Sequence, residues 1–444
     1  MKIVPGWLCL NWRRSDSNRR IEARLALAAW IASMLEYYGF FLYATAASLV
    51  LGPLYFPAND SSITSLAIFA SVGIGFIARP IGALALGIIG DTLGRRLVLG
   101  ITLFVMGAST FLIGVLPTHQ DIGVLAPLML IVFRFLQGLA VSGQHSGTSS
   151  LALELSDAGR RGFYTSSVLS GTQAGLILAS GCLLLPSVAL SPSSFAAWGW
   201  RIPFLLGFVI VGFGLWTQSH LPESPSFASG TRTSDTWLTP LRHLLCHCKR
   251  DSLLVIAASQ VSVVSSIVGV YSLALAVNVS RMSMTTMLSV QLTSALVGVF
   301  TIPAWAHLSD KIGRRPVFLL GTVLSAILIW PYFLAIDDAN VHMTFVFGIL
   351  LSGIAYGAVN GVWPAMYGEM FATRIRITGM ASTTQIGFAL TAQAPLAATF
   401  LTGESSDWSV APWITSIGCL VSVLAVLRFP ETSRINVDEL GSKP

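Results

Sequence analysis

Four ionisable side chains stand inside long apolar stretches of the chain, where a charge is costly. They are Glu36, Arg79, Arg134 and His145. A charged side chain at the centre of a membrane helix costs about 2.5–3.5 kcal/mol on insertion scales, so each such residue is a functional candidate. Glu36 is the only carboxylate well inside an apolar stretch, and we expect it to carry the proton if protons drive this protein. His145 is the second candidate, because an imidazole titrates near neutral pH.

Each assignment has a structural alternative. Glu36 and Arg79 each lie about 18 Å along a helix from the nearest charged loop, so they could form a permanent ion pair that only fixes helix packing. His145 could be a hydrogen-bonded packing residue. Arg134 competes with Arg79 for the single carboxylate, and this surplus of positive charge favours a substrate that bears a carboxylate.

Uncharged polar and aromatic side chains in the apolar stretches could line a cavity, where they would offer hydrogen bonds and ring faces. Packing and interface positions are the alternative for each of them. The candidates are Tyr38, Tyr43, Gln137, Gln173, Tyr271, Asn278, Tyr356, Asn360, Trp363 and Gln385.

The composition determines which elements position these residues. Of 444 residues, 54% are hydrophobic and only 10% are charged, which excludes a soluble globular enzyme. The apolar residues suffice for about twelve membrane helices of about twenty residues. We therefore predict an all-α membrane protein with twelve transmembrane helices in two six-helix halves. The predicted spans are 22–52, 63–90, 97–116, 124–153, 163–188, 200–220, 252–278, 285–307, 316–336, 342–368, 377–401 and 411–429.

The one long polar stretch divides these spans into two groups of six. The predicted organisation is an N-terminal tail (1–21), an N-terminal half (22–220), a central linker (221–251), a C-terminal half (252–429) and a C-terminal tail (430–444). Most of the 26 Lys and Arg residues fall in the tails and loops on one side of these spans. Since basic residues accumulate on the cytoplasmic side, both termini are predicted to be cytoplasmic. We expect no cleaved signal peptide, because no long apolar run precedes a small-residue cleavage site in the first twenty residues.

A loop motif occurs twice. Gly90-Asp91-Thr92-Leu93-Gly94-Arg95-Arg96 follows the second span, and Ser309-Asp310-Lys311-Ile312-Gly313-Arg314-Arg315 follows the eighth. A weaker echo joins ELSDAGRRG after the fourth span to EMFATRIRITG after the tenth. Two related halves are typical of a rocking transporter with its substrate site near the midplane. Acids and arginines at these helix ends could form a latch that breaks when the protein changes state. The alternative is that Arg95 and Arg96 only anchor the topology. Its predicted members are Gly90, Asp91, Gly94, Arg95, Arg96, Glu154, Arg160, Arg161, Asp310, Gly313, Arg314, Arg315, Glu369 and Arg374.

The chain resembles the major facilitator superfamily, whose loop between the second and third helices has the pattern G-x-x-x-D-x-x-G-R-R. Within it the chain is similar to the metabolite:proton symporter family, whose members carry shikimate, 2-oxoglutarate, citrate, or proline and betaine. The segments that carry the resemblance are LEYYGFFLYATAASLVLGPLYFP, GFIARPIGALALGIIGDTLGRR, RFLQGLAVSGQHSG, GRRGFYTSS, WGWRIPFLLG and LPESPSF, with SDKIGRRP, GEMFATRIRITG and FPETS in the second half. Two acids usual in that family are replaced here, by Gly39 and by Gln144.

The resemblance implies a secondary transporter that imports a small organic acid or zwitterion with a proton by alternating access. An uncoupled facilitator or exporter of the same fold, or a sensor without flux, are the alternatives. We expect no enzyme activity and no cofactor, since no nucleotide loop of the form G-K-[ST] is present. Cys246-His247-Cys248 matches no standard zinc spacing, so no metal is expected. The expected partners are a small-molecule substrate, protons and the lipid bilayer, and no nucleic acid. We expect the protein to be a monomer in a bacterial inner membrane.

Overall fold

The computed structural model describes residues 27, 30–57, 61–93, 95–142, 149, 153, 159–208, 212, 244, 246, 248–372, 375–402, 407–433 and 435. The described residues are almost entirely helical and include no strand. Helical residues occur in each of the twelve predicted spans. Four predicted site residues, His145, Gly94, Glu154 and Arg374, lie outside the described part of the chain.

In the N-terminal half, the first span covers Trp30–Tyr55 and ends in a π-helical turn, η1, and a short α-helix, α2. Thr118 begins α5 with a capping box, in which its N–H and its hydroxyl both donate to Asp121 at 2.8 Å. The helices are η1 (Ala47–Leu51), α2 (Gly52–Tyr55), α3 (Ser61–Leu93), α4 (Arg95–Val115), α5 (His119–Ile122), α6 (Leu125–Val141), α8 (Arg161–Ala189), α9 (Pro192–Ser194) and η2 (Phe195–Gly199), with further helical residues at 201–208.

The C-terminal half contains the other helices. They are α13 (Lys249–Ala258), η3 (Ser259–Ser262), α14 (Val263–Ser266), η4 (Ile267–Tyr271), α15 (Ser272–Asn278), α16 (Met284–Ile312), α17 (Arg314–Asp337), α18 (Val341–Gly348), η5 (Ile349–Ala355), α19 (Tyr356–Gly368), α20 (Arg376–Thr391), α21 (Ala394–Thr402) and α22 (Val410–Val426). Within the described residues of both halves, seven helical segments are long and apolar enough to cross a membrane. They are Trp30–Tyr55, Leu66–Ala83, Arg161–Ala189, Lys249–Asn278, Met284–Ile312, Arg314–Asp337 and Val341–Gly368. Shorter apolar helices at Gly100–Val115, Leu125–Val141 and Val410–Val426 account for three more predicted spans.

Two spans of the C-terminal half change their helical type midway. The span Lys249–Asn278 passes through the 3₁₀ turn η3 and the π-helical segment η4, and the span Val341–Gly368 passes through the π-helical segment η5. Wider π turns occur often at functional sites, because they displace side chains from the regular helical positions.

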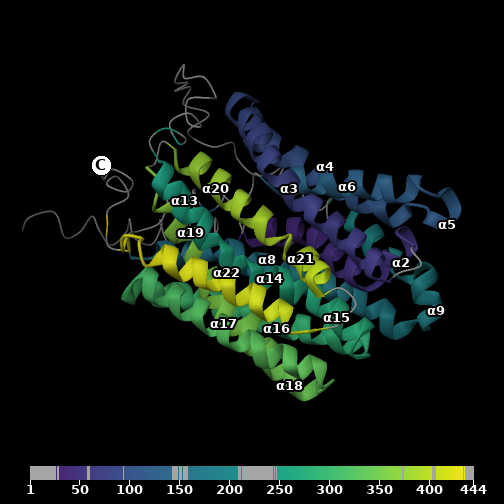
Figure 1. Ribbon diagram of the computed structural model, residues 1–444. Coiled ribbons are helices and arrows are strands. Elements are labelled where there is room, and N and C mark those ends of the chain that lie inside the picture. Colours follow the sequence, from purple (N-terminus) through teal and green to yellow (C-terminus); the bar gives the residue numbers. More distant parts are fainter. Residues whose placement is uncertain are drawn as a thin grey trace, which may run out of the picture.

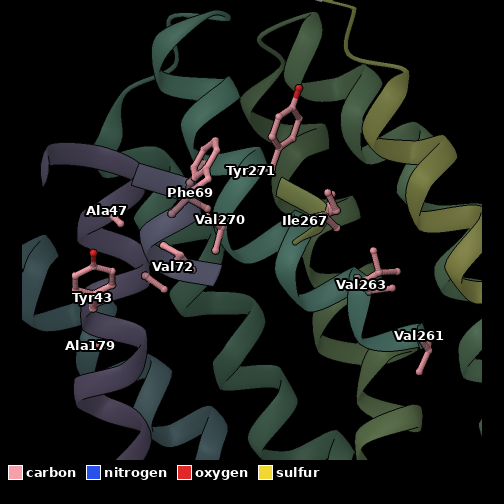
Figure 2. Close-up of a cluster of buried hydrophobic side chains, with 14 of the residues drawn as sticks. Tyr43, Ala47, Phe69, Val72, Ala179, Val261, Val263, Ile267, Val270 and Tyr271 are labelled. Atoms are coloured by element: carbon pink, nitrogen blue, oxygen red, sulfur yellow. The ribbon is translucent and has the colours of Figure 1, made fainter. Parts of the chain in front are cut away.

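The two halves meet along long helices at the centre of the molecule. Figure 1 shows α3, α4 and α6 on one side and α17, α18 and α22 on the other, with α8, α16 and α14 between them. Across the boundary α16 packs against α8, and α20 packs against α3. Figure 2 shows the apolar core at this boundary, where Phe69 of α3 lies beside Tyr271 of η4, with 6.4 Å between their ring centroids.

Within the N-terminal half, α3 and α6 cross at a pair of glycines. A Cβ added at Gly138 of α6 would overlap the backbone carbonyl oxygen of Gly75 in α3. A Cβ added at Gly75 would in turn lie 2.6 Å from Nε of Arg134. Glycine at both positions therefore allows the close backbone approach that brings Arg134 against α3.

Candidate functional site

A cavity of about 100 Å³ lies between the two halves. It is lined from the first span, α3 and α8 on one side and from the segments α14 to α19 and Pro395 on the other. None of its lining residues is charged; the walls combine apolar side chains with hydroxyl and amide groups. The polar members are Thr45, Gln173, Ser265, Ser266, Gln291, Ser294, Tyr332, Ser352 and Tyr356.

The charged groups lie behind an aromatic wall of this cavity. Phe40 of the first span and Phe76 of α3 both line the cavity, and their rings meet edge to face with centroids 4.9 Å apart. The Cζ atom of Arg79 lies 4.2 Å from the centroid of each ring. The guanidinium thus rests on the two aromatic faces, in the geometry of a cation–π contact.

Arg134 of α6 contacts the same wall from another side. Its Cζ atom lies 4.1 Å from the centroid of Phe40 and 4.4 Å from that of Tyr43. Its Nη1 donates to Oε1 of Gln137 at 3.2 Å and, more weakly, to the carbonyl of Phe40 at 3.5 Å. Gln137 donates in turn to the Thr110 hydroxyl at 2.9 Å. Predicted residues Arg134, Gln137 and Tyr43 are therefore brought together.

Glu36 is buried, with 3% of its surface exposed, and lies in the electrostatic reach of Arg79. Its carboxylate nevertheless forms no ion pair within 4.0 Å with any residue that the structure describes, and both its oxygens lack a hydrogen-bond donor among those residues. The Nε and Nη2 atoms of Arg79 and of Arg134 equally lack an acceptor in the described part of the chain. Glu36 and Arg79 are thus close, but they are not joined by direct contact.

The remaining predicted polar residues lie partly in the cavity lining and partly inside one of the two halves. Gln173 and Tyr356 line the cavity. The Tyr43 hydroxyl is hydrogen-bonded to Ser71 at 2.6 Å, and Tyr38 donates to the Pro203 carbonyl at 2.6 Å inside the N-terminal half. Tyr271 has its hydroxyl 3.3 Å from that of Thr402.

In the C-terminal half the predicted polar residues are mostly buried. Asn360 and Gln385 are both buried, and neither amide atom of Gln385 has a partner among the described residues. Trp363 packs against Phe388, with ring centroids 5.6 Å apart. Asn278 is exposed at the end of α15. Of the ten candidates, only Gln173 and Tyr356 belong to the described lining of this cavity, and the other eight do not line it.

The sequence reasoning did not single out the aromatic wall or most of the hydroxyl groups. Phe76 stands three residues before Arg79 in one helix, so the two side chains share a face. This spacing could have indicated that an aromatic ring lies next to the Arg79 guanidinium. By contrast, Gln291, Ser294 and Ser352 reach the cavity only through the packing of α16 and η5, which no local pattern reveals.

A second cluster lies at the end of the bundle predicted to be cytoplasmic. The Asp310 carboxylate accepts hydrogen bonds at 3.0 Å from the backbone N–H groups of Gly162 and Phe163, in the first turn of α8. It also accepts from Nη1 of Arg314 at 2.7 Å. An anion at a helix N-terminus is favoured by the unpaired N–H groups and by the helix dipole. One carboxylate therefore joins α16 to α8 across the two halves.

Glu369 is the second anion of this cluster. Its carboxylate lies 3.3 Å from Nη2 of Arg314 and 3.9 Å from Nη1 of Arg161. It also accepts from the Thr432 hydroxyl at 2.5 Å. Arg161, Arg314 and Glu369 are each no more than 1% exposed, so this network is shielded from solvent.

The segment after α22 closes the cluster. Glu431 accepts hydrogen bonds from the backbone N–H groups of Arg314 at 2.9 Å and Arg315 at 3.1 Å, and so caps the start of α17. Burial raises the pKa of Glu431, but these backbone donors and Ser433 lower it further, and the net result is a pKa below its ordinary value. The carbonyl of Ile435 accepts from Arg161 at 2.8 Å, which joins this segment to the other half. We call Asp310, Arg314, Glu369, Arg161 and Glu431 the end cluster.

The remaining predicted latch residues lie in different surroundings. Gly313 adopts φ 109°, a conformation that favours glycine, where α16 turns into α17. Arg315 donates to the Leu427 carbonyl at 2.8 Å, and Arg160 is exposed just before α8.

In the first copy of the motif, which runs from Gly90 to Arg96, the structure describes only the backbone. Gly90 and Asp91 lie in the last turn of α3, and Arg95 and Arg96 begin α4.

Comparison with known proteins agrees with this architecture. Residues 25–235 match the family described as "Sugar (and other) transporter", and residues 252–443 match the "Major Facilitator Superfamily". The chain is 32% identical to the shikimate transporter of Escherichia coli (strain K12), over 93% of this chain and 95% of the relative. It is 31% identical to the citrate-proton symporter of Klebsiella pneumoniae, over 81% of this chain and 80% of the relative.

Solved structures show the same fold. A structure of the proton:xylose symporter XylE bound to 6-bromo-6-deoxy-D-glucose superimposes with a TM-score of 0.75 at 18% identity, covering 96% of this chain and 99% of that one. This likeness confirms the predicted all-helical fold with twelve transmembrane helices. The protein is therefore a multi-pass membrane transporter and not an enzyme, and the chain belongs to the major facilitator superfamily, in its metabolite:proton symporter family.

Proposed function

We propose that this protein imports a small organic acid together with a proton, by rocking two six-helix halves around the central cavity. The halves are residues 22–220 and 252–429, joined by the linker 221–251. The protein would act as a monomer in a bacterial inner membrane with both termini in the cytoplasm. The charge pattern of the loops and the bacterial relatives support this placement.

One observation carries the choice of an acid as substrate. Arg79 and Arg134 are both buried next to the cavity wall, and each has two N–H-bearing nitrogens without an acceptor among the described residues. Arg79 has a side-chain hydrogen bond with Tyr37 and Arg134 has one with Gln137, but neither has a carboxylate within 4.0 Å among the described residues. A buried cation without a directly paired anion is strongly unfavourable. A substrate carboxylate would supply the missing anion, since a guanidinium binds a carboxylate in a planar, two-bond geometry. The relatives that carry shikimate and citrate support the same choice.

Glu36 is the proposed proton carrier. It is buried beside Arg79 without direct contact, so its charge depends on what else occupies the neighbourhood of that arginine. A bound substrate carboxylate would occupy Arg79 and favour protonation of Glu36; substrate release would favour proton loss. His145 remains the second candidate for carrying the proton.

The alternating-access part of the proposal rests on the end cluster. Asp310 and Arg161 join the two halves at one end of the bundle, and these contacts must break if that end opens. Contacts of this kind are typical of an element with two stable states. The cavity between the halves would then open toward alternate sides of the membrane.

One observation favours an uncoupled facilitator as the second candidate. At Gly39, where the resemblance to metabolite:proton symporters implies an acid, an added Cβ would lie 2.6 Å from the Thr110 hydroxyl oxygen. Thr110 instead accepts a hydrogen bond from Gln137. A neutral hydrogen-bonded pair thus fills the space of that acid, which removes one possible proton acceptor.

Uptake into proteoliposomes distinguishes the two candidates. Labelled shikimate and citrate are supplied to the purified full chain with an inward proton gradient and without one. A symporter accumulates its substrate above the external concentration only with the gradient, and Glu36→Gln abolishes that accumulation while exchange of substrate persists. The matched control is Asp337→Asn, which neutralises an exposed carboxylate at the end of α17, away from the cavity. Equal uptake with and without the gradient in the wild-type protein would establish the facilitator.

A further inference from the structure

We propose that the substrate carboxylate binds between Arg79 and Arg134 in a subsite that the Phe40 ring occupies in the empty protein, so that Phe40 selects net anions over betaine-type zwitterions. This inference rests on the proposed function, and it adds a selectivity residue and a narrower substrate class.

The Phe40 ring contacts two cations. The Cζ atom of Arg79 lies 4.2 Å from the Phe40 centroid, and that of Arg134 lies 4.1 Å from it. Two guanidinium groups next to one ring repel each other, and the face of an aromatic ring compensates a cation only in part. The arrangement is therefore ready to accept an anion.

Both arginines also carry hydrogen-bond donors that could bind an anion. The Nε and Nη2 atoms of both arginines have no acceptor in the described part of the chain, although Arg79 is 2% exposed and Arg134 is fully buried. Buried polar groups are normally paired, and unpaired ones in a native protein call for a ligand or another explanation. A carboxylate has two oxygens and can accept from both guanidinium groups.

The Phe40 side chain controls access from the cavity to these donors. Phe40 belongs both to the cavity lining and to the contacts of the two arginines, so its ring separates the cavity from the free donors. A rotation of this one side chain would connect the cavity to the subsite. Phe76, the other ring against Arg79, would remain as its back wall.

The same aromatic rings determine which substrates can bind. Quaternary ammonium groups are recognised by aromatic faces that are free to receive them. In this protein the faces of Phe40, Phe76 and Tyr43 already carry guanidinium groups. The cavity lining supplies hydroxyl and amide groups but no carboxylate that could pair with an ammonium group. The charge distribution therefore suits a hydroxylated carboxylic acid with net negative charge.

Competition for labelled shikimate uptake tests the selectivity. Unlabelled shikimate, its neutral methyl ester and glycine betaine are added to proteoliposomes of the wild-type protein. We expect the ester and betaine to compete at least about tenfold more weakly than shikimate. Equal competition by betaine or by the ester overturns the inference, while shikimate uptake itself keeps the proposed function intact.

The variant Phe40→Leu tests the role of the ring. Leucine keeps an apolar side chain but offers no aromatic face, so the anion no longer competes with the ring for the two arginines. We expect the KM for shikimate to fall severalfold and kcat to fall as well, because release becomes slower. The matched control is Phe41→Leu, which removes a neighbouring lining ring over which neither guanidinium lies in the described structure. Equal effects of the two variants on KM would overturn the assignment of Phe40.

Chemical modification of the two arginines tests the subsite without a measurement of transport. Phenylglyoxal modifies free guanidinium groups, and peptide mass spectrometry reports the modification of Arg79 and Arg134 separately. In the purified full chain we expect Phe40→Leu to raise the modification rate of both several-fold, and shikimate to suppress it. If no tested acid is transported, the proposed function fails, yet protection of these two arginines by shikimate would still support the subsite. Unchanged modification in the variant, or no protection by shikimate, overturns it.

Discussion

The Asp310 carboxylate in α16 accepts a hydrogen bond from the backbone N–H of Gly162 in α8, at 3.0 Å and across 148 residues of chain. The same carboxylate pairs with Arg314 at 2.7 Å. One acid thus neutralises an arginine of its own half and caps a helix of the other half. Motion between the halves at this end requires that the acid release the N-terminus of α8, while its pairing with Arg314 can persist.

The substitution Asp310→Asn is expected to favour opening of this end. Asparagine keeps one acceptor oxygen but loses the charge, and hydrogen bonds to charged groups contribute about 1.5–3 kcal/mol each. We expect the open population to rise at least about tenfold. Maleimide labelling of a cysteine at Ser166, which is fully buried in α8, measures this population in a background without native cysteines. Asp337→Asn, an exposed acid at the end of α17, is the control, and an equal labelling rate in both variants would contradict the expectation.

Loss of Glu369 should destabilise the protein strongly. Its carboxylate faces Arg314 and Arg161, and both arginines are buried. Breaking a buried ion pair by removing one partner costs about 3–5 kcal/mol, because the other charge stays buried without compensation. We therefore expect Glu369→Gln to lower the Tm in detergent markedly. The exposed Asp338→Asn should leave the Tm unchanged.

The double variant Glu369→Gln with Arg314→Gln provides the matching test. If the penalty comes from an uncompensated arginine, removing that arginine as well should recover part of the lost Tm. Additive losses in the double variant would show that the two residues act independently.

Glu431 should make stability depend on acid pH. Its pKa in the folded protein lies below the ordinary value of 4.5, so its contribution is fully present above about pH 4.5 and is lost as the pH falls through the lowered value. Wild-type Tm is expected to fall over this acid range. Glu431→Gln should have a lower Tm at neutral pH and a shallower decline below it. Parallel pH profiles for the two proteins would exclude this role of Glu431.

The sequence was sufficient to locate Asp310, Arg314 and Glu369, because a repeated motif marks them and helix ends bring motif residues together. Glu431 was not found, since its contact with Arg314 spans 117 residues and depends on how the segment after α22 turns back. Counting residues along the helices predicted that Glu36 and Arg79 could lie at one level, and Arg79 does influence Glu36 electrostatically. It could not predict that the Arg79 guanidinium would rest on Phe40 and Phe76 without touching Glu36, because the rotation of each helix about its axis is set by packing.

The twelve helices were predictable for a different reason. Long apolar runs separated by short polar loops reflect the thickness of the membrane, and this constraint acts on each span alone. The change of helical type at η4 and η5 had no such signal. Val264, Gly269 and Ser352 reach the cavity from those spans, so the detailed shape of the cavity depends on features that a hydropathy pattern does not contain.

Finally, the crossing of α3 and α6 should tolerate no added methyl group at Gly138. A Cβ there would overlap the carbonyl oxygen of Gly75, which is backbone and cannot rotate away. Overpacking of this kind costs about 1–3 kcal/mol. Arg134 lies one helical turn from Gly138, so moving α6 outward also displaces the guanidinium from the Phe40 ring.

We therefore expect Gly138→Ala to lower both the Tm and the affinity for the transported acid. The control is Gly181→Ala in α8, where the nearest atom to an added Cβ is a Leu292 side-chain carbon at 3.6 Å, an ordinary contact distance. Thermal unfolding and substrate-dependent uptake of the two variants are compared at equal expression. A loss of Tm in Gly138→Ala with unchanged KM would mean that the glycine pair supports packing only, and that the position of Arg134 does not depend on this crossing.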